Sequence, residues 1–203
     1  MNAFFLGILI GLTITISFGP GFIALFQTSL SRGLSAGFIL ATGMLLSDLV
    51  LVSISYFGLS ELISKQDYKI LGVIAGIILI VMGMISFYKK PELIKESKIR
   101  PDLNNHMMRY LIKGFLLNIV NPFSLIFWIG LIAFAAKNWE PGNQNFFLFF
   151  TGVFITAFFT DIMKCYLSGQ LKRILTSSTI HLITKTMGII FMGIGFFIIY
   201  KVQ

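Results

Sequence analysis

The stretch FFLGILIGLTITISFGPGFIALFQT (Phe4–Thr28) carries no charge and is almost entirely apolar over 25 residues. At about 1.5 Å of rise per residue, a helix of this length exceeds the roughly 30 Å hydrocarbon core of a bilayer. Near its centre stands Gly19-Pro20-Gly21, where the proline removes a backbone donor and the glycines permit non-helical dihedral angles. The stretch therefore predicts a transmembrane helix that is broken inside the membrane.

Five more apolar stretches are long enough to cross a bilayer, which takes about 20 residues. They cover roughly residues 36–59, 70–88, 111–136, 146–168 and 182–200. Only 12% of the 203 residues are charged, whereas soluble domains carry roughly 25%. We predict an all-α integral membrane protein with six transmembrane helices and no soluble domain.

The longest polar stretch, residues 89–110, marks the midpoint of the chain. We expect a single membrane domain (1–203) made of a first three-helix repeat (1–90), a linker (91–110) and a second three-helix repeat (111–203). Eleven Lys and Arg residues lie in or beside the first, third and fifth connections, against four on the opposite side. The positive-inside rule then places the 89–110 loop in the cytoplasm and both termini outside.

The two halves resemble each other in sequence. Gly76–Lys89 aligns without gaps to Gly188–Lys201 and matches it at six of fourteen positions, at an offset of 112 residues. The intramembrane acids Asp48 and Asp161 differ by 113. Because each half holds three spans, the halves should be inverted relative to each other, as in many secondary transporters.

A second interrupted span is predicted in GFLLNIVNPFSL, where Pro122 follows Asn121. Asn121 can hydrogen-bond the backbone groups that the proline frees, or a ligand, and Asn118 lies one turn earlier on the same face. Proline breaks at matching places in both halves indicate the binding site of a transporter. The alternative is a pair of kinks that serve only packing.

Two acidic positions lie within predicted spans. A carboxylate at mid-span costs about 2.5–3.5 kcal/mol on insertion scales. No basic residue lies within a turn or two of Asp48, so it is partnered from another helix, protonated, or available to a cationic ligand. Asp161 and Lys164 share one helical face and form either a local ion pair or part of the site. Asp48 and Asp161 are the proton-coupling candidates.

Other features narrow the class of protein. The net charge of +8 is concentrated beside apolar spans, which argues against nucleic acid. One cysteine and two isolated histidines give neither a disulfide nor a metal site, and no cofactor is expected. The glycine pairs Gly7/Gly11 and Gly72/Gly76 predict close helix packing. Trp128 and Trp139 are assigned only to packing and interface anchoring.

The motifs at Gly19–Val50 and Lys113–Trp128 resemble those of the lysine exporter (LysE/RhtB) family of bacterial amino-acid exporters. The resemblance covers nearly the whole chain. It implies an exporter of amino acids in the bacterial cytoplasmic membrane, driven by the proton gradient, with the site between two three-helix repeats. It carries the substrate-binding role to these matching residues: Gly19, Pro20, Asp48, Asn118, Asn121 and Pro122. Gly21 completes the predicted site.

The resulting hypothesis is a secondary transporter that binds a small zwitterion and works by alternating access, with the lipid bilayer as its solvent. The sequence does not fix the substrate or the number of copies that associate. Divalent-cation efflux is the runner-up, although it needs several oxygen or imidazole ligands that converge at mid-membrane. A membrane-embedded enzyme and a non-catalytic assembly factor are further alternatives, the former without a recognisable catalytic constellation.

Overall fold

The computed structural model describes residues 2–15, 20–62, 68–88, 103–171 and 176–202, and this part of the chain contains helices and no strand. The helices are α1 (Ala3–Thr15), α2 (Pro20–Arg32), α3 (Leu34–Leu62), α4 (Tyr68–Tyr88), α5 (Leu103–Ile119), α6 (Pro122–Asn138), α7 (Gln144–Leu171) and α8 (Ser177–Val202). The predicted all-α class is therefore confirmed for the described residues.

Three helices are long and apolar enough to cross a bilayer alone: Leu34–Phe57 in α3, Gln144–Gln170 in α7 and Ser178–Val202 in α8. A fourth crossing results if α5 and α6, which meet at an angle of 65°, form one broken span. Ala3–Thr13 and Gly72–Tyr88 are apolar but shorter. By length and composition this is a multi-pass membrane protein, while the count of six spans stays a prediction.

Large apolar side chains cover much of the outside of the molecule. Phe57, Phe159, Phe196 and Phe197 are each more than 60% exposed. An apolar exterior of this kind marks a surface in contact with lipid or another protein, and lipid is the natural solvent of these long apolar helices.

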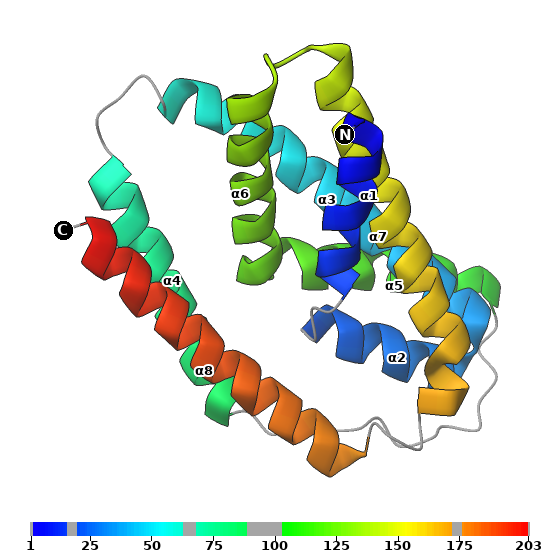
Figure 1. Ribbon diagram of the computed structural model, residues 1–203. Helices are drawn as coiled ribbons and strands as arrows, with labels where there is room; N and C mark the ends of the chain where they lie inside the picture. Colours follow the sequence, from blue (N-terminus) through cyan, green and yellow to red (C-terminus); the bar gives the residue numbers. More distant parts are fainter. Residues whose placement is uncertain (1, 16–19, 63–67, 89–102, 172–175, 203) are drawn as a thin grey trace.

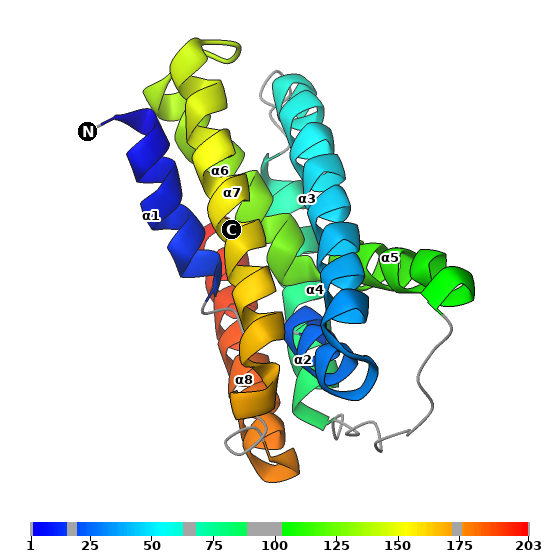
Figure 2. The same ribbon diagram turned by 90° about the vertical axis from the view of Figure 1, so that its right-hand side faces the viewer.

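The helices associate mainly in three pairs, α1 with α7, α3 with α5, and α4 with α8 (Figures 1 and 2). The α4/α8 pair lies to one side and runs antiparallel (Figure 1). It reaches the other helices through Ile180, which is buried with Phe22 and Phe26 of α2, and through Phe191, whose ring stacks on Phe123 at 6.0 Å.

Glycines bring the paired helices into backbone contact. A Cβ atom at Gly7 of α1 would overlap the carbonyl group of Phe149, and one at Gly152 of α7 would overlap that of Phe4. A Cβ atom at Gly11 would meet the Thr156 side chain of α7 at 2.8 Å and the Val153 carbonyl oxygen at 3.0 Å. In lipid, where no hydrophobic force drives helices together, such close approach is a main source of packing energy.

Glycines also lie at the contacts within the α3/α5 and α4/α8 pairs. A Cβ atom at Gly114 of α5 would overlap the carbonyl group of Leu40, and one at Gly43 of α3 would overlap that of Leu111. In α4, a Cβ atom at Gly76 would meet the Gly195 carbonyl oxygen of α8 at 2.8 Å, and one at Gly72 would meet the Val202 side chain at 2.6 Å. The close packing predicted for Gly7, Gly11, Gly72 and Gly76 is thus confirmed, and α3/α5 adds a contact that was not predicted.

The core beside the site is aromatic. Trp128 of α6 has no exposed surface, and its ring stacks on Phe154 of α7 at 4.9 Å between centroids. Leu51 of α3 and Ala3 of α1 belong to the same buried cluster. Residues of α1, α3, α6 and α7 therefore share one buried cluster, within which Trp128 packs directly on α7.

Substitution of Gly114 by Ala is expected to destabilise the protein, because the new methyl group must push α3 and α5 apart at the Leu40 carbonyl. Overpacking of this kind costs about 1–3 kcal/mol. Gly130→Ala is the matched control, since a Cβ atom there meets nothing within 4 Å. The measurement is the melting temperature of each purified variant in detergent. Equal melting temperatures for the two variants would contradict the close α3/α5 contact.

Candidate functional site

A cavity lies where α2, α3, α5, α6 and α7 meet. It offers about 50 Å³ to water-sized groups, and because one water needs about 10–15 Å³, it can hold a few waters or the polar end of a small solute. Its lining residues are Gly21, Phe22, Met44, Asp48, Asn118, Asn121, Phe123, Ser124, Ala157, Asp161 and Lys164.

The break between α5 and α6 forms one wall of this cavity. Pro122 begins α6, where its missing N–H is tolerated. Asn121 is the N-cap residue, with φ −79° and ψ 111°, and its Oδ1 accepts a hydrogen bond of 3.2 Å from the Phe123 N–H. The Asn121 N–H in turn donates to the Asn118 carbonyl at 3.1 Å. The side chain predicted to bond the freed backbone therefore does so.

Asp48 of α3 is buried and is held from the other half of the chain. Its Oδ1 accepts hydrogen bonds from Trp128 Nε1 at 2.6 Å and from Asn118 Nδ2 at 2.7 Å. Of the three alternatives left open for this acid, partnership from another helix is the one seen. Both partners are neutral, so the carboxyl group remains available to a cation or a proton in the cavity.

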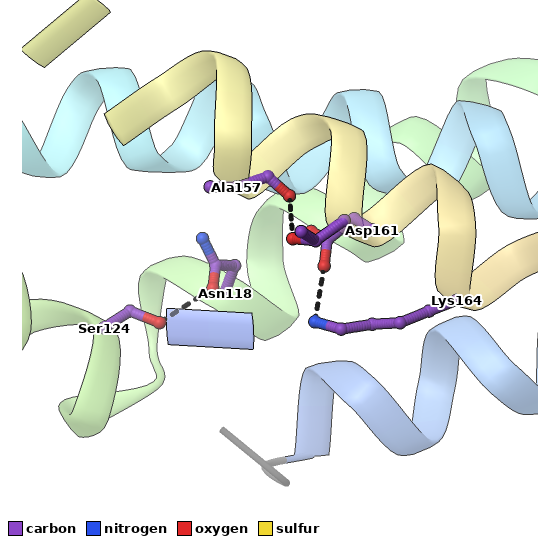
Figure 3. Close-up of polar contacts among 6 residues, drawn as sticks. Asn118, Ser124, Ala157, Asp161 and Lys164 are labelled. Carbon is purple, nitrogen blue, oxygen red and sulfur yellow. Dashed lines mark hydrogen bonds and ion pairs between the residues drawn. The ribbon is translucent and has the colours of Figure 1, made fainter. Parts of the chain in front are cut away.

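A chain of side-chain hydrogen bonds continues from Asn118 to the break. Ser124 Oγ donates to Asn118 Oδ1 at 2.8 Å (Figure 3) and accepts from Asn121 Nδ2 at 3.1 Å. Asn118 Nδ2 also bonds the Met44 carbonyl at 3.1 Å. The carboxyl group on α3 is thereby connected to both sides of the α5/α6 break, and buried polar groups that satisfy one another in this way fix a single geometry.

Asp161 and Lys164 form the opposite wall, on α7. Lys164 Nζ lies 2.8 Å from Asp161 Oδ1 (Figure 3), and the two side chains are 14% and 17% exposed. Lys164 Nζ also lies 5.9 Å from the centre of the Phe22 ring, in the first turn of α2. The cavity therefore carries two acids and one base.

Most of the predicted site residues come together here. Gly21, Asp48, Asn118, Asn121 and Asp161 all line the cavity. Pro20 and Pro122 are the first residues of α2 and α6, and Gly19 lies outside the described residues. That these residues bind a substrate or carry protons stays a prediction.

Two residues of this network, Ser124 and Trp128, were not predicted from the sequence as site residues. Trp128 was assigned to packing and interface anchoring, but its indole N–H donates a hydrogen bond to Asp48 at a fully buried position. A signal was available, because Asn121, Ser124 and Trp128 are spaced i, i+3 and i+7 and so share one face of α6.

No group of three or more His, Cys, Asp or Glu side chains suited to a metal ion occurs in the part of the chain that the structure describes. The cavity offers Asp48 and Asp161, the second of which is already paired with Lys164.

The family model of the LysE-type translocators matches residues 12–202. The chain belongs to this family. It is also 24% identical over 206 residues to a protein of Bacillus subtilis (strain 168) named "Putative amino acid efflux protein YcgF", with 99% of this chain and 97% of that protein covered. No solved structure matches the chain.

The family resemblance inferred from the motifs is thus confirmed. LysE-type translocators are transporters and not enzymes, and the matched region includes Asp48, the α5/α6 break and the Asp161–Lys164 pair. In this LysE-type translocator, every polar side chain that lines the cavity lies inside the family match.

Replacing Trp128 by Phe should destabilise this translocator, because the Asp48 carboxyl group loses one of its two donors. Asn118 still donates to the carboxyl group in this variant, so the expected cost is that of one hydrogen bond, about 0.5–1.5 kcal/mol. A double-mutant cycle with Asp48→Ala, read from thermal unfolding in detergent, isolates the bond from the packing of the ring.

We expect a coupling energy of about 1 kcal/mol or more in this cycle. Trp139→Phe is the control: its ring packs on Phe149 at 5.3 Å, and the described residues show no bond from it to Asp48. Strictly additive effects of Trp128→Phe and Asp48→Ala would show that the bond contributes nothing.

Proposed function

We propose that this protein is a secondary transporter that exports amino acids, or closely related small zwitterions, across the bacterial cytoplasmic membrane in exchange for protons. The observation that carries the proposal is a buried carboxyl group, Asp48, on a polar cavity at an interrupted helix. Intramembrane acids on a cavity mark solute and proton pathways. The family match and the name of the Bacillus subtilis relative support efflux of amino acids.

The proposed architecture has six spans, with α1/α2 and α5/α6 as broken first and fourth spans, arranged as two inverted three-helix repeats. The glycine contacts support it. The contact of Gly7 on α1 with Phe149 on α7 has a counterpart in the other half of the chain. It is the contact of Gly114 on α5 with Leu40 on α3. Gly7 and Gly114 are 107 positions apart in the sequence, and Leu40 and Phe149 are 109 positions apart.

The α4/α8 pair supports the same symmetry. A Cβ atom at Gly76 would meet the Gly195 carbonyl at 2.8 Å, and one at Gly188 would meet the Gly83 carbonyl at 2.6 Å. An offset of 112 converts the first contact into the second. The distribution of Lys and Arg supports a cytoplasmic 89–110 loop with both termini outside.

In the proposed mechanism a zwitterion enters from the cytoplasm and its amino group pairs with Asp48. Oδ1 of this acid is already oriented by Trp128 and Asn118, and the described residues give Oδ2 no hydrogen bond. The substrate carboxylate lies toward the start of α2, near Gly21, where the helix presents the positive end of its dipole. Asn121 and Asn118 contribute polar groups on the α5/α6 side.

The net charge of the occupied cavity explains why a proton would be bound. With a zwitterion bound, two acids and one base leave the cavity with one net negative charge, and burying a net charge in a membrane is costly. A proton from outside neutralises Asp48, weakens its contact with the amino group and releases the solute. Rocking of one repeat against the other then changes which side the cavity opens to.

The experiment is export from bacteria that lack their own amino-acid exporters. Cells expressing the protein receive dipeptides one at a time, and amino acids in the medium are quantified. We expect one class of amino acid to accumulate outside, and Asp48→Asn to lower its export by about tenfold or more, as loss of a charged contact predicts. Glu140→Gln removes an exposed acid away from the cavity and should leave export unchanged.

Wild-type export by an Asp48→Asn variant would contradict the role of Asp48. If no amino acid accumulates although the protein is present in the membrane, the amino-acid proposal is wrong and efflux of another solute takes its place.

A further inference from the structure

We infer that Lys164 is the receptor for the substrate carboxylate and that Asp161 is its partner only while the cavity is empty. The inference rests on the proposed function and names the chemical group that the site selects: a free α-carboxylate. It gives the Asp161–Lys164 pair a role in binding, in addition to the mutual neutralisation of two partly buried charges.

The position of Lys164 is the first observation. Among the described residues that line the cavity it is the single cationic side chain. Its distance to the Phe22 ring places it beside the first turn of α2, where helix geometry already favours an anion. A lysine needed only to offset Asp161 could face another helix or the lipid headgroups, whereas this one faces the cavity.

The second observation is the hydrogen-bonding capacity of Lys164. An ammonium group has three N–H donors. One is used on Asp161 Oδ1, and the described residues provide no acceptor for the other two. At a partly buried position that faces a cavity, these two donors are available to a carboxylate from a solute.

The ion pair is also easy to open. Asp161 and Lys164 are three residues apart on one helix, so the ion pair itself does not join two helices. Exchange of Asp161 for a substrate carboxylate replaces one ion pair by another, and the freed Asp161 faces the same cavity as the substrate amino group. The exchange conserves charge and forms or breaks no covalent bond.

The comparison of the two repeats separates the roles of the acids. The glycine contacts of α3 and α7 give an offset of 109, so Ala157, not Asp161, is the counterpart of Asp48. Asp161 lies one turn further along α7. The two acids therefore need not do the same work: Asp48 holds the amino group, and the Asp161–Lys164 pair selects the carboxylate.

The test uses the full-length purified protein in liposomes and measures counterflow of labelled L-alanine, L-leucine, L-threonine and L-lysine. Each acid competes with its own α-carboxamide, which keeps the amino group and side chain but lacks the negative charge. For the wild type we expect the carboxamide to compete at least about tenfold less well than the acid, as loss of a charged hydrogen bond predicts.

Lys164→Ala should weaken binding of the acid until acid and carboxamide compete equally, and Lys164→Arg should restore part of the difference. Lys185→Ala is the matched control, because it removes a lysine that packs on the Phe87 ring at 4.6 Å outside the cavity. Size-exclusion chromatography in detergent verifies that each variant is folded.

Equal competition by acid and carboxamide in the wild type, or full discrimination in folded Lys164→Ala, would overturn the inference and leave the proposed function standing. Absence of wild-type counterflow with any L-amino acid would contradict the proposed function, and the inference would fall with it.

Discussion

The hydrogen bonds to one buried carboxyl group set the arrangement of the helices around the cavity. Asp48 on α3 accepts hydrogen bonds from Asn118 on α5 and Trp128 on α6, at 2.7 and 2.6 Å. Because the two donors lie on opposite sides of the α5/α6 break, the carboxyl group sets the angle between the half-helices as well as its own position. A change in its charge alters the hydrogen bonds that hold the break, and in the proposed mechanism this connects solute and proton binding to the orientation of the half-helices.

The break is stable only because its polar groups are paired inside the protein. Lipid offers no partners for free backbone groups, so non-helical backbone at membrane depth must be satisfied locally or line a cavity. Asn121 caps α6, and Ser124 joins this cap to Asn118 and so to Asp48. Packing through glycine carbonyl contacts holds the surrounding helices. The polar network thus fixes the geometry of the break, and the glycine contacts hold the surrounding helices close together.

Local signals in the sequence were enough to locate most of the cavity. A proline break at Asn121-Pro122 and an acid inside an apolar span at Asp48 each have a local energetic cost. Such a cost can be inferred from the sequence of one segment alone. The partners of Asp48 were not readable in the same way, because Trp128 is 80 residues away and its indole fits both lipid interface and core. The close α3/α5 packing at Gly43 and Gly114 was missed for the same reason, since it depends on which helices meet.

Proton-coupled export is tested most directly by efflux of a labelled amino acid from liposomes that contain only the purified protein, with and without an imposed pH gradient. We expect efflux above that of protein-free liposomes, accelerated when the outside is more acidic, and loss of this acceleration in Asp48→Asn. Efflux no faster than in protein-free liposomes, from folded protein and for every amino acid, would contradict proton-coupled export.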